Sequence, residues 1–314
     1  MFIINYSLQD SLGFLISRYI FVLIFIFCNV ILLVFISKSK IASKTATTLI
    51  KTQTGCDIFI LMSLIMTIFK EPKHFKSENF TYVRFFCNFM INNQIFWTLL
   101  TISTYLMVAL SIDRFICISL PIYYRRRKYY LVYFYIITSI IFGTISCSMN
   151  FFDVKIISYQ KNKTWFHNCP YGKSVFSSTV FIITYSVGPV LIIVILNAIA
   201  IRQLLKSTKN NSNVTTENYV FARRKLLTRF TVATFITNFT YAVILLVDIT
   251  IYLLYTYEGQ LTRLFDYYFY YNQYICCILA VINPIVYLIL FRKFREFIFL
   301  LFTTNQIMLE KSKQ

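Results

Sequence analysis

Long apolar runs separated by short polar segments dominate this sequence from end to end. A helix needs about 20 apolar residues to cross the hydrocarbon layer of a bilayer. Seven runs are long enough to be candidate membrane helices: 14–37, 48–69, 85–118, 129–150, 175–203, 222–255 and 264–290. A backbone in lipid must satisfy its own hydrogen bonds, so unbroken runs of this length predict helices. They argue against a membrane β-barrel, which shows ten-residue stretches of alternating polarity.

A short amphipathic segment follows the seventh run. Within residues 291–302, Phe291, Phe294 and Phe297 recur at helical spacing against Arg and Lys, a pattern typical of a helix in the membrane interface. The sequence therefore predicts an all-α membrane protein, a seven-transmembrane helix bundle with a short amphipathic eighth helix. The expected divisions are an N-terminus (1–18), a transmembrane domain (19–290), an interfacial helix (291–302) and a tail (303–314).

Composition supports a membrane protein, and the basic residues predict its orientation. Only 14% of residues are charged, against roughly a quarter in soluble domains. The net charge of +19 lies almost entirely between the apolar runs, which indicates membrane topology and not nucleic-acid binding. If the N-terminus is outside, the inner segments hold 19 Lys and Arg and the outer segments hold 10. The positive-inside rule then predicts an extracellular N-terminus and a cytoplasmic C-terminus.

Charges within the runs are few and costly, so each is a candidate functional residue. Asp113 and Arg114 lie at the inner end of the third run, inside SIDRFICISLPIYY. A buried Arg needs a carboxylate or water, and exposure of this pair when helices separate would make a two-state latch. The alternative is a charge pair that only marks the end of a membrane helix.

The seventh run contains the sequence NPIVY near its inner end. Pro284 removes a backbone donor and kinks or weakens the helix there. Asn283 can satisfy the freed backbone or reach another helix, and Tyr287 brings a hydroxyl to the inner end. The alternative is an incidental proline kink.

Asp57 lies deep in the second run without a basic neighbour at helical spacing. A carboxylate at this depth must be protonated, hydrogen-bonded or paired with a cation. Ser103 and Asn283, on other predicted helices, are the expected partners.

Two cysteines fall on the predicted outer side, Cys87 at the outer end of the third run and Cys169 in the loop after the fourth. The oxidising side of the membrane favours one disulfide between them, and two free thiols are the alternative.

Three sequons also lie outside, and Asn5, Asn79 and Asn162 are the candidate glycosylation sites.

Together these features resemble the rhodopsin-like, or class A, G-protein-coupled receptors over residues 19–302. The resemblance rests on SIDRF with the following SLPIYY, on NPIVY with the following FRKF, and on Pro189 in the fifth run. Asn29 and Asp57 fit the polar positions of helices one and two. The order of these motifs and their placement on the correct helix ends make the combination specific.

The chain also departs from that family's pattern. The sixth run lacks the Cys-Trp-x-Pro element, and in the matching stretch Phe239 is expected to replace the aromatic switch residue. Asn197 stands where helix five usually has a tyrosine. Phe221 stands where an acid often pairs with the helix-three arginine, which predicts a weaker inactive lock. The fourth helix lacks its central tryptophan, and the third is slightly long before its arginine, so either it is bulged or the disulfide geometry is shifted.

The resemblance assigns roles to individual residues of this chain. It implies activation and G-protein coupling roles for Asp113, Arg114, Asn283, Pro284, Tyr287 and Phe239. It implies an interior polar or sodium-like site formed by Asn29, Asp57, Ser103 and Asn283. It implies an outer ligand pocket lined by Asn92, Phe96, Trp97, Tyr185, Asp248, Tyr271 and Tyr274.

The ligand class follows from two negative observations. Phe96 lies where amine receptors carry an aspartate, and Cys277 lies where opsins carry the retinal lysine. Both a monoamine ligand and light sensing are therefore disfavoured. A neuropeptide or another small ligand that enters the bundle is the preferred interpretation, because the outer N-terminus is short.

The sequence thus predicts a plasma-membrane receptor that binds an extracellular peptide or small molecule and activates a heterotrimeric G protein, without a cofactor, metal or nucleic-acid partner. A receptor-like protein that binds ligand without coupling is the alternative, suggested by Asn197 and the sixth run. A transporter would need a polar path at mid-membrane, where Asp57 is nearly isolated. An enzyme is disfavoured, because the two histidines lie in outer loops and no nucleophile or metal constellation is present.

Overall fold

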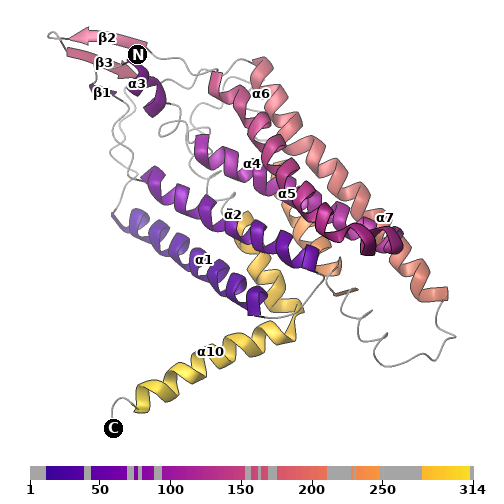
Figure 1. Cartoon of the computed structure of the whole chain (residues 1–314). Helices are drawn as coiled ribbons and strands as arrows, with labels where there is room; N and C mark the ends of the chain where they lie inside the picture. The colour runs from indigo at the N-terminus through magenta and orange to yellow at the C-terminus, as the bar shows by residue number, and fades with distance from the viewer. Residues whose placement is uncertain are drawn as a thin grey trace.

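The helices form an elongated bundle with a small sheet at one end (Figure 1). The computed structural model describes residues 12–38, 44–68, 74–76, 80–87, 94–152, 157–161, 164–168, 175–210, 228–229, 231–247, 250 and 278–311. Its labelled helices are α1 (Leu12–Lys38), α2 (Lys44–Ile68), α3 (Phe80–Phe86), α4 (Gln94–Ser119), α5 (Pro121–Phe152), α6 (Val175–Ile182), the π-helix η3 (Ile183–Val187), α7 (Gly188–Asn210) and α10 (Arg292–Lys311). Two more apolar helices, Thr231–Val247 and Ile278–Leu290, are called the 231–247 and 278–290 helices below.

All seven predicted apolar runs contain a helix. Within the described ranges, five helical stretches are long and apolar enough to cross a membrane: Tyr19–Lys38, Lys44–Ile65, Gln94–Ser119, Pro121–Ser148 and Thr179–Gln203. The 231–247 and 278–290 helices are apolar but shorter. The predicted sixth and seventh runs extend into stretches outside the described residues, so their full lengths stay predictions.

The central element is α4, which packs against α2, α5 and α7. Its polar side chains Ser103, Ser111, Asp113 and Arg114 are all buried. Polar groups inside a membrane bundle must find partners on neighbouring helices, so the polar pattern of α4 determines which helices it contacts through hydrogen bonds. By contrast, α1 exposes large apolar side chains such as Phe21 and Phe27 at its outer surface, as a lipid-facing helix would.

The helices α4 and α5 pack closely at Gly143. A Cβ atom added there would lie 2.6 Å from Cγ1 and 2.8 Å from Cα of Ile102. Only a residue without a side chain fits at that distance, so Gly143 allows α5 to pack directly on the α4 backbone.

The fifth predicted run is helical throughout but contains the π-helix η3, immediately before Pro189. Proline has no amide hydrogen and its ring clashes with the carbonyl one turn earlier, so a wider turn relieves the conflict. The amide of Gly188 instead donates to the carbonyl of Ile183, five residues back. The carbonyl of Thr184 accepts a hydrogen bond of 2.9 Å from the Tyr105 hydroxyl, which ties η3 to α4.

A three-stranded antiparallel sheet lies at the far end of the bundle from α10 (Figure 1). Its order is β1 (His74–Lys76), β3 (Thr164–Asn168), β2 (Ile157–Lys161), with His74 paired to Asn168 and Lys161 to Thr164. The sequence analysis predicts outer loops for the segments that contain His74 and His167, whereas the structure forms strands there. The β2–β3 hairpin is rich in β-branched and aromatic residues, which suit strands.

The predicted start of the third membrane helix, at residue 85, was wrong. Residues 85 and 86 belong to α3, which lies beside the sheet, whereas α4 begins at Gln94 (Figure 1). Apolar composition alone marked the two segments as continuous, because α3 contains four aromatic residues and no charge except Arg84.

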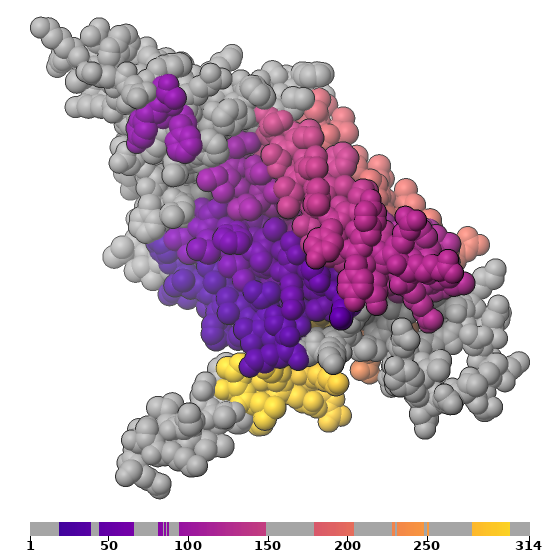
Figure 2. All heavy atoms as spheres, viewed as in Figure 1, coloured from indigo at the N-terminus to yellow at the C-terminus, as the bar shows by residue number. Residues whose placement is uncertain are grey.

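At the opposite end, α10 lies across the end of α1 (Figures 1 and 2). Phe294 and Phe297 pack on Phe35, with ring centroids 4.7 Å and 5.5 Å apart. These are the apolar positions that predicted an amphipathic helix. The helix itself continues to Lys311, beyond the predicted end at residue 302.

The junction between the 278–290 helix and α10 is closed by a side chain. The guanidinium of Arg295 donates hydrogen bonds of 3.1 Å and 2.6 Å to the carbonyls of Leu288 and Ile289. The last carbonyls of a helix have no partner within the helix, so a cation near its C-terminus stabilises it.

Candidate functional site

The predicted latch residues form a buried ion pair at the α10 end of α4. Nη2 of Arg114 lies 2.5 Å from Oδ2 of Asp113, and the two side chains are 2% and 0% exposed. Tyr287 of the 278–290 helix lies within electrostatic range of the Arg114 guanidinium. Phe221, which stands where an acid could have paired with this arginine, lies outside the described residues.

The interior carboxylate of Asp57 is surrounded by hydrogen-bond donors. Oδ1 accepts 3.1 Å bonds from the Gln53 amide and the Ser103 hydroxyl, and Oδ2 accepts a 3.1 Å bond from the Asn283 amide. The Gln53 amide also donates to the Ser103 hydroxyl. The structure therefore brings Asp57, Ser103 and Asn283 together as expected. It adds Gln53, a partner that the sequence analysis missed although its i,i+4 spacing from Asp57 could have signalled it.

Asn29 belongs to a different contact. Its amide donates to the carbonyls of Phe25, at 3.0 Å, and Ala280, at 2.9 Å. The expectation that Asn29 joins the Asp57 cluster was wrong, because the hydrogen bonds described for its amide go to backbone carbonyls and not to Asp57. Asn29 instead joins α1 to the backbone of the 278–290 helix, one turn before Asn283.

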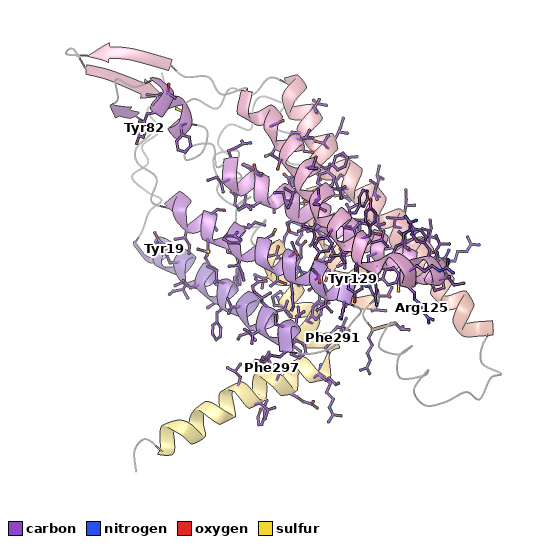
Figure 3. The ribbon with its side chains drawn as sticks, in the orientation of Figure 1. Tyr19, Tyr82, Arg125, Tyr129, Phe291 and Phe297 are labelled. Carbon is purple, nitrogen blue, oxygen red and sulfur yellow. The ribbon has the colours of Figure 1, made fainter. Side chains whose placement is uncertain are left out.

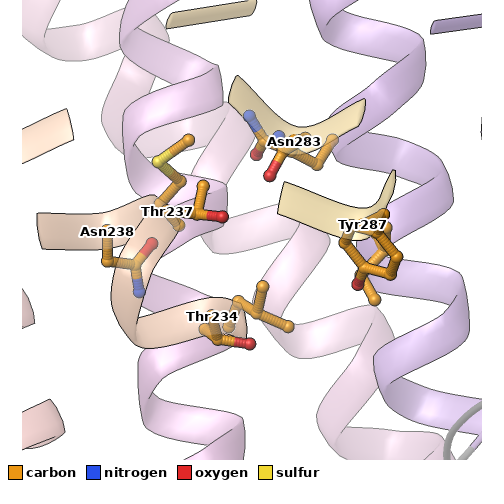
Figure 4. A pocket seen from close by; sticks show the side chains of 9 residues that line it. Thr234, Thr237, Asn238, Asn283 and Tyr287 are labelled. Atoms are coloured by element: carbon orange, nitrogen blue, oxygen red, sulfur yellow. The ribbon is translucent and has the colours of Figure 1, made fainter. Parts of the chain in front are cut away.

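A small cavity separates the Asp57 cluster from the 231–247 helix (Figure 4). It has room for about one water molecule. Its polar lining comes from three helices: Gln53, Thr234, Thr237, Asn238, Asn283 and Tyr287. Figure 4 shows the threonines and Asn238 on one side, facing Asn283 and Tyr287 on the other.

Pro284 and Tyr287 of the NPIVY sequence are also buried. Pro284 directly follows Asn283, and the Tyr287 ring stacks on Phe291 with centroids 5.0 Å apart.

A second polar cluster centres on Ser111, which the sequence analysis did not single out. Its hydroxyl accepts hydrogen bonds of 2.7 Å from Asn238 and 3.3 Å from Asn197. It donates to the carbonyl of Met107 in its own helix. Asn197 replaces the usual tyrosine of helix five, and Asn238 directly precedes Phe239 in the stretch that matches the missing Cys-Trp-x-Pro element. Both therefore meet at one hydroxyl, between α4, α7 and the 231–247 helix.

Phe239 does not occupy an interior position. Its side chain is 55% exposed and stacks on Phe235 at 6.0 Å, on the outer face of the helix. The expectation that Phe239 replaces an interior switch residue was therefore wrong in placement. The buried aromatic residue of this helix is Tyr241, 1% exposed, whose hydroxyl is hydrogen-bonded to Thr104 of α4. Helical rotation places residues 239 and 241 about 200° apart, so only one of them can face the interior.

A comparison with known families tests the arrangement as a whole. The model of the 7 transmembrane receptor (rhodopsin family) matches residues 28–287. The chain belongs to the rhodopsin family of seven-transmembrane receptors. This confirms the predicted fold and membrane class, and it confirms that the chain is a receptor and not an enzyme. No curated protein matches the sequence significantly.

In this receptor, three of the expected ligand-contact residues form one aromatic cluster. Trp97 meets Phe96, Phe181 and Tyr185 edge-on, with centroids 5.4 Å, 6.1 Å and 6.2 Å away. Phe181 and Tyr185 stack in parallel at 5.1 Å. The other expected pocket residues lie outside the described residues: Asn92, Asp248, Tyr271 and Tyr274.

The receptor's Cys87 is buried and disulfide-bonded. Four other cysteines, on α1, α2, α4 and α5, form no disulfide: Cys28, Cys56, Cys117 and Cys147. The predicted partner Cys169 lies outside the described residues, as do the glycosylation candidates Asn5, Asn79 and Asn162.

Proposed function

We propose that this receptor lies in the plasma membrane with its N-terminus outside, binds an extracellular peptide or small molecule, and activates a heterotrimeric G protein. The observation that carries the proposal is the buried Asp113–Arg114 pair at the α10 end of α4. A charge pair this deep costs free energy to bury and is stable only while neighbouring helices enclose it. Separation of those helices exposes a cationic fork to a partner on that side.

Basic residues gathered at the same end support the orientation. Figure 3 shows Arg125 and Tyr129 of α5 at the end of the bundle that carries Phe291 and Phe297. Lys128 and Lys44 lie over the Tyr129 ring, 5.1 Å and 5.9 Å from its centroid. Basic side chains that lie along aromatic rings at a helix end suit the anionic inner surface of a membrane. We infer that this end faces the cytoplasm.

The ligand assignment rests on the aromatic cluster around Trp97. The indole Nε1 of Trp97 is buried and has no hydrogen-bond partner among the described residues. Burial of a donor without a partner is costly, so such a group favours a ligand that supplies an acceptor. A peptide carbonyl is one such acceptor, and aromatic walls suit the apolar part of a peptide or small ligand.

The outer end is completed by a disulfide, for which we propose the pair Cys87–Cys169. β3 ends at Asn168, directly before Cys169, and pairs with β1, which precedes α3 and Cys87 in the chain. The sheet thus brings the two segments together. On the same outer side, Asn5, Asn79 and Asn162 are the proposed glycosylation sites.

The coupling proposal is tested by G-protein activation in cells that express matched variants. Arg114→Ala should lower basal and ligand-driven activation at least about tenfold, because it removes the cationic group offered to the partner. Asp113→Asn should raise basal activation, because it removes the charge that holds Arg114 inside. Arg292→Ala is the control, since Arg292 is 81% exposed on α10 and pairs with Glu296 on the same helix.

Surface expression is measured for every variant, and a peptide and metabolite library supplies candidate ligands. Opposite shifts for Arg114→Ala and Asp113→Asn, with little change for Arg292→Ala, support coupling through the latch. Wild-type protein at the surface whose signal equals that of Arg114→Ala under all conditions favours the alternative, a receptor-like protein that binds ligand without coupling. The substitutions at Asn197 and in the 231–247 helix motivate that alternative.

A further inference from the structure

The donor set around Asp57 decides whether a cation fits at this carboxylate, where a sodium-like site was expected. A sodium ion there needs oxygen lone pairs from the carboxylate and from neighbouring hydroxyl or amide groups. An ionised carboxylate offers about four lone-pair positions. Three are taken by hydrogen bonds from Gln53, Ser103 and Asn283.

The amide nitrogen of Gln53 lies between two oxygens that could serve as cation ligands. It is within hydrogen-bond distance of both the Asp57 carboxylate and the Ser103 hydroxyl. Its two hydrogens carry partial positive charge and point at these oxygens. The Ser103 hydroxyl gives its hydrogen to Asp57 and accepts from Gln53. These residues therefore do not fit a bound cation.

The whole cluster is buried. Gln53 is 4% exposed, Asp57 1% and Ser103 2%, so the groups depend on one another for partners. With the nitrogen of Gln53 toward Asp57, every contact pairs a donor with an acceptor. The reverse orientation of the amide would set its oxygen against the carboxylate, which is unfavourable unless a cation lies between them.

We propose that the side-chain amide of Gln53 is a built-in replacement for the cation, and that this receptor binds no sodium ion at Asp57. The amide cannot leave or exchange with solvent. The link from α2 through Asp57 to Asn283 of the 278–290 helix is therefore independent of the sodium concentration on either side of the membrane.

The test is the melting temperature of the purified full-length receptor in nanodiscs, in sodium, potassium or choline chloride at equal ionic strength. The wild type should melt at the same temperature in all three salts. Gln53→Leu keeps a similar volume but frees the oxygens of Asp57 and Ser103. A cation that binds the folded state raises its stability by mass action, so this variant should melt roughly 2–4 °C higher in sodium than in potassium.

Two further variants make the result specific. Gln53→Leu combined with Asp57→Asn should lose the sodium response, because the carboxylate is gone. Thr54→Ala is the matched control, since Thr54 is buried on the same helix and its hydroxyl donates to the Ile50 carbonyl. It should stay unresponsive, as the wild type does. If Gln53→Leu does not fold, Gln53→Ala replaces it.

Three outcomes overturn the proposal. The first is a sodium-specific rise in the wild type that disappears in Asp57→Asn. The second is a folded Gln53→Leu or Gln53→Ala protein without a sodium response, and the third is a response in Thr54→Ala. The measurement uses neither ligand nor G protein, so its result is independent of whether the receptor couples.

Discussion

The side-chain amide of Asn238 donates a 2.7 Å hydrogen bond to the hydroxyl of Ser111, three residues before Arg114 on α4. Asn197 of α7 reaches the same hydroxyl at 3.3 Å. One buried serine thus joins α4 to α7 and to the 231–247 helix. The expected weakness of the inactive state, based on Phe221, overlooked this connection. A neutral hydrogen-bond cluster can hold these helices together where Phe221 replaces the acid that could pair with Arg114.

Removal of the Asn238 amide should loosen that connection. Asn238→Leu keeps a similar volume and eliminates the bond to Ser111. A buried side-chain hydrogen bond contributes about 0.5–1.5 kcal/mol, so the open state should gain roughly 2- to 10-fold in population and basal G-protein activation should rise accordingly. Activation per receptor at the cell surface is the measurement.

The matched control is Thr240→Val on the same helix. Thr240 is half-buried, and its hydroxyl donates to the Ile236 carbonyl of the same helix at 2.9 Å, so no hydrogen bond between helices is lost. Basal activation should stay at the wild-type level. Equal effects of Asn238→Leu and Thr240→Val on basal activation would mean that the Ser111 cluster does not stabilise the inactive state.

Substitutions at Tyr241 and at Phe239 test which of the two is the interior aromatic residue of the 231–247 helix. Tyr241→Phe keeps the buried ring and removes the hydroxyl bonded to Thr104, so the receptor should lose about 0.5–1.5 kcal/mol of stability and change its basal signal. Phe239→Leu alters a side chain that is 55% exposed and should change neither. Thermal melting and basal activation of both variants are compared. A larger effect at Phe239 would restore the assignment made from the sequence.

The motif residues were predictable because their chemistry is local. Asp113 and Arg114 are adjacent in the chain, and a buried arginine has few other choices of partner. Asp57 without a local cation required partners from other helices, and Ser103 and Asn283 supplied them. In each case, a costly group in an apolar run limited the possible arrangements to a few.

The rotation of the 231–247 helix could not be read in the same way. Both faces of this helix carry aromatic and polar side chains, so periodicity does not distinguish them. Alignment to a motif that the chain lacks placed Phe239 inside. The structure sets the rotation through Asn238 and Tyr241, whose partners Ser111 and Thr104 lie on a helix more than 100 residues away in sequence. Such pairings emerge only when the two helices are packed together.

Two helical glycines, Gly143 and Gly55, should respond to substitution by alanine with opposite changes in stability. An added Cβ at Gly143 would lie 2.6–2.9 Å from the side chain and backbone of Ile102, so Gly143→Ala must push α5 away from α4. Overpacking of this kind costs about 1–3 kcal/mol. At Gly55 no atom lies within 4 Å of the added Cβ. Gly55→Ala should therefore stabilise α2 by about 0.5–1 kcal/mol through the better helix propensity of alanine. Thermal melting of both variants in the same nanodiscs checks the pair. A Gly143→Ala receptor as stable as Gly55→Ala would show that α4 and α5 are not packed through this glycine.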